Sequence, residues 1–245
     1  MSTTFHELTV SAVEPLTPSA VALSFAVPAE LRQTFAFRPG QHVTVRLDGE
    51  LRRSYSICST PADLRDRGLL TIGVKRVPGG VFSTRAQGLA AGETLPVLPP
   101  LGRFTTELDP SRTRRYGAIV AGSGITPVLS LVATALAVEP ASTFTVICGN
   151  RSAAEVMFAD ALADLKDRHG SRLQLVHVLS REMQPGDLLS GRLDGERVTA
   201  LLQEFDLAEV QEWFLCGPLG VVRSARDALA AVGAAGKVHV ELFRA

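Results

Sequence analysis

The short stretch RRSYS, residues 52–56, places two arginines, an aromatic ring and two hydroxyls within five positions of a strand-like apolar segment. A guanidinium can bind phosphate through paired N–H donors, and an aromatic ring packs well against a flat ligand. A strand can direct cations to solvent, but this dense combination is typical of a binding site. It predicts a ligand that contains both phosphate and a flat polar ring.

Three glycine-containing turns provide further candidate sites. GSGITP, residues 122–127, follows a predicted strand and opens a predicted helix, where free backbone N–H groups and the helix dipole favour an anion. It lacks the Gly-Lys-Ser/Thr ending of a Walker loop and is not a complete G-x-G-x-x-G fingerprint, so ATP hydrolysis is not expected. GGVFS, residues 79–83, and CGP, residues 216–218, have a similar setting. Taken singly, the 122–127 loop is equally consistent with an ordinary strand-to-helix turn. The 79–83 loop alone favours a hairpin turn, and Cys216 alone favours a small buried apolar residue.

The elements that must position these residues change in type partway along the chain. From residue 5 to about 104, short alternating apolar segments are separated by Pro and Gly, which predicts an antiparallel β-barrel or sandwich. From residue 116 onward, compact strands alternate with helical segments at 128–137 and 158–170, which predicts an α/β domain around a parallel sheet. The polar segment 105–116 resembles a connector. We therefore predict one domain over residues 1–109 and a second over residues 110–245.

Composition narrows the class of protein. The 245 residues are 46% apolar and 20% charged, with a formal net charge of zero, so a sizeable core is expected and binding to nucleic acid or to an anionic membrane surface is disfavoured. Three widely spaced cysteines argue against a disulfide framework and against a metal or iron–sulfur site held by these residues alone. With neither a signal peptide pattern nor a membrane-spanning apolar run in the sequence, we predict a cytoplasmic protein.

Taken in order, RSYSICS, GGVFS, GSGITP, CGP and the terminal VELF resemble the ferredoxin–NADP⁺ reductase superfamily, and the resemblance covers nearly the whole chain. Within that superfamily, RSYSICSTP, GVKRVPGGVFS and GNRSAAEVMF are most similar to the reductases of aromatic oxygenases, including the reductase component of the phenylacetyl-CoA epoxidase system. The resemblance implies an FAD-binding β-barrel followed by an NAD(P)-binding α/β domain, with the active site in the cleft between them.

For the first domain, the resemblance implies a flavin site. Arg53 would bind the FAD pyrophosphate, Tyr55 would pack on the isoalloxazine, and Ser56 would form a hydrogen bond near flavin N5. Gly80, Val81, Phe82 and Ser83 match the segment that offers backbone N–H groups and a hydroxyl to the same pyrophosphate. Val74 and Lys75 match the residues that pass alongside the flavin, and Ser54 is a further predicted cofactor-binding residue. Arg52 has no matching role, and we interpret it as solvated.

For the second domain, the resemblance implies a pyridine nucleotide site. The loop that receives the nucleotide matches Gly122, Ser123, Gly124, Ile125 and Thr126. The turn that holds nicotinamide near the flavin matches Cys216, Gly217 and Pro218. Glu241 and Phe243 match a terminal acid and aromatic, although a plain C-terminal strand is about as good an interpretation. In relatives this aromatic covers the flavin face that nicotinamide occupies, so Phe243 would move during turnover. Ser56, Cys216 and Glu241 are the predicted catalytic residues.

Nucleotide preference and the electron acceptor complete the prediction. Ser180 and Arg181 follow a predicted strand, where relatives that prefer NADPH bind its 2′-phosphate, so we predict NADPH over NADH, with Arg151 as a weaker candidate contact. We expect hydride transfer from NADPH to FAD and single-electron delivery to an iron–sulfur acceptor of an aromatic or CoA-thioester oxygenase. The alternatives are an NADH-dependent reductase of a haem protein or free flavin, and a non-catalytic nucleotide-sensing subunit.

The similar reductases continue past a segment like VELF into a [2Fe–2S] domain with a C-x₄-C-x₂-C run. This sequence contains no such spacing. The acceptor is therefore expected either in a longer form of the chain or in a separate protein.

Overall fold

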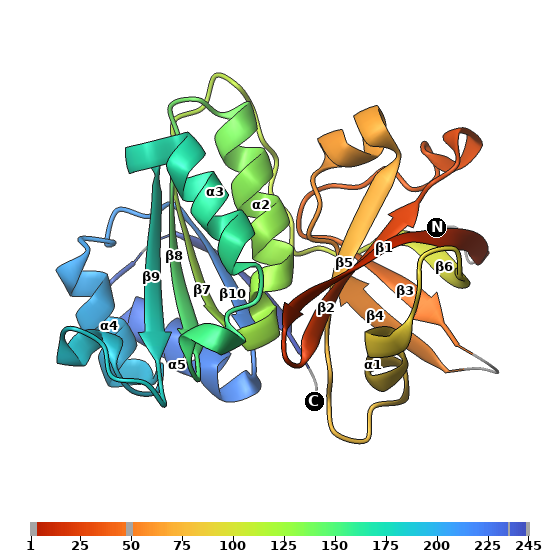
Figure 1. Cartoon of the computed structure of the whole chain (residues 1–245). Coiled ribbons are helices and arrows are strands. Elements are labelled where there is room, and N and C mark those ends of the chain that lie inside the picture. The colour runs from red at the N-terminus through yellow and green to blue at the C-terminus, as the bar shows by residue number, and fades with distance from the viewer. Residues whose placement is uncertain (1–3, 48–50, 235, 244–245) are drawn as a thin grey trace.

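Two β-sheets of different type make up most of the computed structural model, which describes residues 4–47, 51–234 and 236–243 (Figure 1). The first is a six-stranded antiparallel sheet within residues 6–101, and the second is a five-stranded parallel sheet within residues 115–242. The predicted fold class, an antiparallel β-barrel followed by an α/β domain, is therefore confirmed. The position of the domain boundary between residues 109 and 110 stays a prediction.

The antiparallel sheet closes on itself. Its strands, in the spatial order β4-β3-β6-β1-β2-β5, are β1 (His6–Thr17), β2 (Ala20–Ala26), β3 (His42–Arg46), β4 (Arg52–Ser56), β5 (Leu69–Lys75) and β6 (Thr94–Leu101). The two end strands meet where Ile57, just past β4, forms an antiparallel bridge with Ile72 of β5, and the Cys58 N–H donates to the Thr71 carbonyl at 2.9 Å. Apolar and polar residues alternate along these strands because one face of the sheet packs into the barrel core. Closure of the barrel thus fixes β4, which carries the predicted flavin contacts of residues 53–56, beside β5.

The parallel sheet is covered on both faces, which explains why its strands are nearly continuous apolar runs. Its order is β11-β10-β7-β8-β9, with β7 (Arg115–Ala121), β8 (Thr143–Asn150), β9 (Leu173–Leu179), β10 (Glu212–Gly217) and β11 (Lys237–Leu242). Its helices are α2 (Ile125–Val138) and α3 (Ala159–His169) on one face and α4 (Gly195–Glu204) and α5 (Leu219–Ala231) on the other (Figure 1). No helix in the described part of the chain is long and apolar enough to cross a membrane.

Short helical segments connect these elements. They are η1 (Ala29–Leu31), η2 (Asp63–Arg67), α1 (Val81–Arg85), η3 (Ala86–Gly88), η4 (Gly122–Gly124), η5 (Ala153–Glu155), η6 (Gly170–Arg172) and η7 (Asp187–Leu189). Of these, α1 and η4 belong to the two glycine loops that the sequence singles out.

The two domains share a core at their seam. Cys58 and Phe104 from the first domain belong to the same buried apolar cluster as α2 and one face of the parallel sheet. The Ser130 hydroxyl on α2 donates to the Ser59 carbonyl at 2.6 Å, which ties the helix to the end of the β4 segment. A Cβ atom at Gly73 of β5 would lie only 2.8 Å from the Phe158 ring, so glycine allows close approach there. The seam therefore holds β4, β5, α2 and the sheet ends at fixed positions.

Candidate functional site

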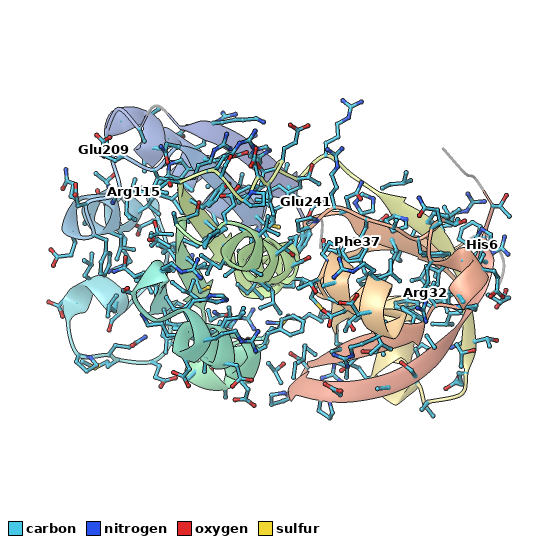
Figure 2. All side chains as sticks on the ribbon, turned by 90° about the horizontal axis from the view of Figure 1, so that it is seen from above. His6, Arg32, Phe37, Arg115, Glu209 and Glu241 are labelled. Carbon is cyan, nitrogen blue, oxygen red and sulfur yellow. The ribbon has the colours of Figure 1, made fainter. Side chains whose placement is uncertain are left out.

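The hydroxyl of Ser56 lies where the two sheets meet. Ser56 ends β4 and is only 4% exposed, and its Oγ donates to Glu241 Oε2 at 3.1 Å. Glu241 stands on β11 in register with Cys216 on the neighbouring strand β10. Figure 2 shows Glu241 between the two halves of the molecule. The fold thus brings the three predicted catalytic residues together from segments up to 185 positions apart.

Burial sets the protonation of this cluster. It raises the pKa of Glu241 to about 7, against the smaller opposing effect of the hydrogen bond from Ser56. Burial lowers the pKa of His42, whose Nδ1 lies 3.9 Å from Glu241 Oε1, and it raises the pKa of Cys216 well above the usual value of a thiol. His42 and Cys216 are therefore neutral near pH 7. Glu241 is balanced between acid and carboxylate, which is the property required of a group that takes up and releases a proton.

The first predicted flavin contacts lie together on the barrel. Arg53 and Tyr55 are two positions apart on β4, so both point to the same side of the strand. The Tyr55 ring packs against Phe82 of α1, with centroids 5.0 Å apart and planes inclined by 38°. Burial raises the pKa of Tyr55 to about 12, an effect that the nearby charge of Arg53 partly offsets. This arrangement joins an exposed guanidinium, a half-buried ring and the start of α1.

The loop into α1 offers hydrogen-bond donors. Within the described residues, the backbone N–H groups of Val81, Phe82 and Ser83 find no acceptor, as expected at the start of a helix. The Ser83 hydroxyl, in contrast, accepts from the Val77 N–H at 3.1 Å and donates to the Gly80 carbonyl at 3.3 Å. The loop therefore presents main-chain donors, while its serine holds the turn together.

Three other predicted flavin contacts are placed differently. The Ser54 hydroxyl lies 2.9 Å from Thr44 Oγ1 on the other side of β4. The Val74 side chain is fully buried in the barrel core, so only its main chain can face a ligand. Lys75 Nζ lies 3.4 Å from Glu155 Oε2 across the domain seam. Lys75 thus fastens the two domains in this structure.

The two glycine turns of the second domain touch each other. A Cβ atom at Gly124 would lie 2.3 Å from the Cys216 carbonyl oxygen, so only glycine permits this approach. Gly217 has φ +144°, a conformation that side chains disfavour, and the turn continues through Pro218 into α5. Gly122 has φ +54°, and a Cβ there would meet no atom within 4 Å, so the loop borders open space.

The remaining loop residues fix the start of α2. Ile125 begins the helix and is buried, and the Thr126 hydroxyl donates to the Ser123 carbonyl at 2.8 Å. At the C-terminal end, the Phe243 N–H donates to the Gly217 carbonyl at 3.2 Å, and the Phe243 side chain packs against the shared core. The predicted terminal aromatic thus lies beside the predicted nicotinamide turn.

The residues predicted to select the nucleotide form a separate group at the ends of β8 and β9. The Ser180 N–H donates to the Asn150 carbonyl at 2.9 Å, and the Arg181 N–H donates to the Arg151 carbonyl at 2.8 Å. Both arginine side chains are exposed, and Arg151 lies 3.9 Å from Glu155. The sheet order places this pair of strands at the edge opposite β11. The group therefore lies away from the Ser56–Glu241 contact but next to the Glu155 ion pair.

Sequence reasoning did not identify three residues of the site: His42, Glu155 and Phe158. Phe158 adopts a left-handed conformation with φ +60°, and it packs on Gly73 at the seam. The glycine inside strand β5 was the available signal, because glycine in a strand often marks a close approach. His42 and Glu155 carry no local signal, since each meets its partner only in the folded chain.

Comparisons with known proteins identify the type of each domain. A model of the oxidoreductase FAD-binding domain matches residues 7–106, and a model of the oxidoreductase NAD-binding domain matches residues 118–227. The chain is 46% identical over 249 residues to a component of the 1,2-phenylacetyl-CoA epoxidase of Escherichia coli, covering 98% of this chain and 68% of that protein. It is 36% identical over 242 residues to the ferredoxin reductase component of the 3-ketosteroid-9-alpha-monooxygenase of Rhodococcus rhodochrous, covering 96% and 64%.

Structural comparison supports the same fold. A solved ferredoxin–NADP⁺ reductase from Plasmodium falciparum matches with a TM-score of 0.75 and 15% identity, covering 98% of this chain and 96% of that chain. At such low identity the match shows the fold alone. The chain spans 64% to 68% of the length of the two relatives described above.

Proposed function

Because the chain belongs to the ferredoxin–NADP⁺ reductase superfamily and is an FAD-dependent NAD(P)H oxidoreductase, we propose that it transfers hydride from NADPH to FAD and delivers single electrons to an iron–sulfur acceptor of an oxygenase. The observation that supports this most directly is the contact of Ser56 with Glu241 beside Cys216. It lies between a barrel that presents Arg53 and Tyr55 and a sheet that presents the Gly124 turn.

The residues of the barrel fit the flavin dinucleotide. The exposed Arg53 guanidinium and the unpaired N–H groups at the start of α1 would hold its pyrophosphate, and Tyr55 would pack on its ring. Bound FAD would supply the capacity to accept a hydride and to release electrons singly. The protein's part is then to bind, orient and shield the reacting groups.

Ser56 and Glu241 would control a proton beside the flavin. The Ser56 hydroxyl is held by Glu241, so its orientation is fixed by a carboxyl group that itself exchanges a proton near pH 7. Ser56 is buried and the Glu241 side chain is only 18% exposed, so bulk water has limited access to this pair. Cys216 and Gly217 would set the position of the nicotinamide, because their turn contacts the Gly124 loop directly.

For nucleotide choice, we propose that Arg181 binds the 2′-phosphate of NADPH, with Ser180 and Arg151 nearby. A charge-assisted hydrogen bond contributes about 1.5–3 kcal/mol, so Arg181→Ala should lower kcat/KM for NADPH by about 10- to 100-fold and leave that for NADH unchanged. Arg168→Ala, an exposed arginine on α3, is the matched control. An unchanged NADPH/NADH ratio in the Arg181 variant would show that the assignment is wrong.

The proposed acceptor follows from the relatives. The Escherichia coli relative is a component of an epoxidase, and the Rhodococcus relative is the ferredoxin reductase component of a monooxygenase. We therefore propose an iron–sulfur protein of an oxygenase system, acting on an aromatic compound or a CoA thioester, as the physiological acceptor.

The experiment that tests the function begins with the purified protein supplied with FAD. We expect flavin absorbance that bleaches anaerobically on addition of NADPH, followed by reoxidation on addition of ferricyanide or a [2Fe–2S] ferredoxin. Ser56→Ala should retain FAD but bleach more slowly, since only the hydroxyl contact is removed. A protein that does not take up FAD, or that binds it without any reduction by NADPH or NADH, would contradict the proposal.

A further inference from the structure

The last strand of the parallel sheet leaves an apolar stripe uncovered. Val238, Val240 and Leu242 on β11 are 37%, 44% and 47% exposed, although they alternate along one strand in the manner of core residues. In register with them on β10 stand residues that include the fully buried Trp213 and Leu215. The stripe thus continues the apolar face under α5 beyond the edge of that helix. Exposed apolar residues on an edge strand are unusual unless a partner covers them.

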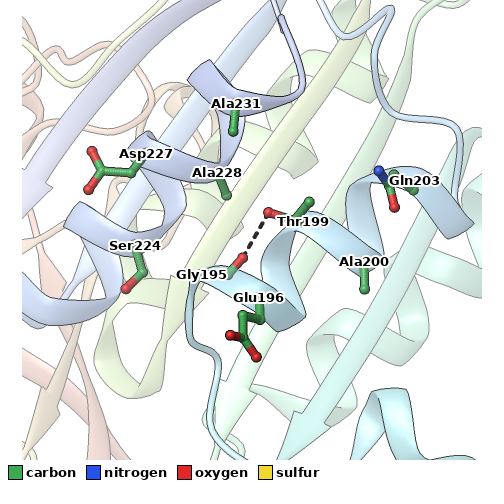
Figure 3. Close-up of a pocket in the computed structure, with 9 residues that line it drawn as sticks. All are labelled: Gly195, Glu196, Thr199, Ala200, Gln203, Ser224, Asp227, Ala228 and Ala231. Atoms are coloured by element: carbon green, nitrogen blue, oxygen red, sulfur yellow. Dashed lines mark hydrogen bonds between the residues drawn. The ribbon is translucent and has the colours of Figure 1, made fainter.

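Helix α5 adds two cations beside the stripe. Ser224, Asp227 and Ala231 of α5 line the groove shared with α4 (Figure 3). Since Val222, Ala225 and Leu229 face the sheet, helical spacing leaves Leu219, Arg223 and Arg226 on the opposite flank, next to β11. Leu219 is 47% exposed, and both arginines are exposed with no ion pair among the described residues. We call this surface, made of Leu219, Arg223, Arg226, Val238, Val240 and Leu242, the β11–α5 surface.

We propose that the β11–α5 surface docks the electron acceptor, an acidic carrier protein with an apolar contact face. The inference rests on the proposed function and names the place where the acceptor binds. Apolar groups flanked on one side by two arginines complement a partner whose apolar contact face carries acidic residues along its edge.

Continuity with the site supports this occupant. Leu242, at one end of the surface, pairs in register with Gly217 of the proposed nicotinamide turn. The preceding residue, Glu241, is the partner of the Ser56 hydroxyl. Successive side chains of β11 point to opposite faces of the sheet, so a carrier seated on the stripe would approach the site at the carboxyl ends of β10 and β11 and not through Glu241 itself.

Charge argues against a second copy of this chain as the occupant. A twofold interface would place the same patch against itself, so Arg223 and Arg226 would face their own counterparts. Like charges at an interface disfavour association, and the surface has no acidic residue among its six members.

The test uses the FAD-loaded protein and a plant-type [2Fe–2S] ferredoxin of net negative charge as the probe. Binding is measured by isothermal titration calorimetry at low and high salt, independently of turnover. Arg223→Glu/Arg226→Glu should raise Kd by about tenfold or more at low salt, and the loss should shrink at high salt. Val240→Ser should raise Kd about threefold at both salts, since an apolar contact is not screened.

Two matched controls separate docking from general effects. Arg168→Glu/Arg192→Glu makes the same change in net charge away from β11, and Met183→Ser removes an apolar side chain that is 92% exposed elsewhere. Both should bind ferredoxin like the original protein. All variants should reduce ferricyanide from NADPH at the original rate, because a small acceptor needs no docking surface.

The outcomes distinguish this inference from the proposed function. Equal loss of binding in the charge control, or unchanged binding in both test variants, would overturn the docking site. A dimer of the protein that Val240→Ser dissociates would also overturn it, because a second copy would then be the occupant. Failure to reduce ferricyanide from NADPH, with patch-dependent ferredoxin binding intact, would instead refute the proposed function and leave the docking surface standing.

Discussion

Replacing Gly124 by alanine tests whether the contact between the two turns positions the nucleotide. The added Cβ would lie 2.3 Å from the Cys216 carbonyl oxygen and 2.7 Å from its carbon, both main-chain atoms that cannot rotate away. Gly124 has φ −60°, which alanine adopts freely, so steric contact is the sole change. The turns must separate by about 1 Å to restore ordinary contact.

Two consequences follow from that displacement. Overpacking of this kind destabilises by about 1–3 kcal/mol, and each kcal/mol lowers Tm by roughly 2–4 °C in a protein of this size. A misplacement of about 1 Å at the reacting groups lowers the rate by about 10²-fold. Gly124→Ala should therefore slow flavin reduction far more than its modest loss of Tm suggests.

The assay is anaerobic stopped-flow reduction of the FAD-loaded protein by NADPH, with Tm measured by calorimetry. Gly195→Ala is the matched control, because a Cβ at the start of α4 would meet no atom within 4 Å. That control should keep its rate and gain about 0.4–1 kcal/mol from reduced freedom of the unfolded chain. If Gly124→Ala reduced its flavin at the original rate, the turn contact would have no part in positioning the nucleotide.

Three further predictions concern charged groups. Burial raises the pKa of Glu241 from 4.5 to about 7, so the folded protein binds a proton at Glu241 more tightly than the unfolded chain does. The stability that this proton contributes is therefore lost as the pH rises from about 4.5 to 7. Glu241→Gln should therefore gain stability relative to the original protein between about pH 4.5 and 7, by up to about 3 kcal/mol in thermal unfolding, and a constant difference would contradict the assigned pKa. Glu212→Gln should destabilise by about 1.5–3 kcal/mol in urea unfolding, because it removes the carboxylate charge that accepts from Arg114 at 2.7 Å, while the 32% exposed Arg114 side chain keeps access to water. A double-mutant cycle of Lys75→Met and Glu155→Gln should give a coupling free energy of only about 0.2–1 kcal/mol that falls with salt, since both side chains are about a quarter exposed. A larger, salt-independent coupling free energy would mean that this ion pair is more shielded from solvent than the structure indicates.

The sequence predicted element types well because local signals controlled them. Glycine and proline marked the turns, and the change from alternating to continuous apolar segments marked the change from an antiparallel to a parallel sheet. The residues on β4 and in the glycine loops could be proposed from motif order, because each motif is contiguous. The structure then placed Arg53, Tyr55 and the start of α1 side by side.

What the sequence could not give were relations between distant residues. Lys75 stays a predicted flavin contact, and its Nζ lies 3.4 Å from Glu155, 80 positions later, because the seam brings β5 to η5. Val74 lies in the expected strand with its side chain in the core, since a strand alternates and the barrel face takes every second residue. The contact of His42 with Glu241 and the closure at Ile57 and Ile72 likewise depend on long-range pairing, for which no local pattern exists.

Cys58 and Phe104 of the barrel share a buried apolar core with the α2 face of the parallel sheet, and this core holds the two domains together. A hinge motion that separated the two domains would expose this apolar surface to water, which costs free energy. Nucleotide entry by separation of the two domains is therefore unfavourable. Under the proposed function, nucleotide entry would then depend on the Phe243 side chain, which packs against this core while its backbone N–H donates to the Gly217 carbonyl at 3.2 Å. Under the proposed function, a fixed frame of this kind would keep the distance between hydride donor and flavin constant from one turnover to the next.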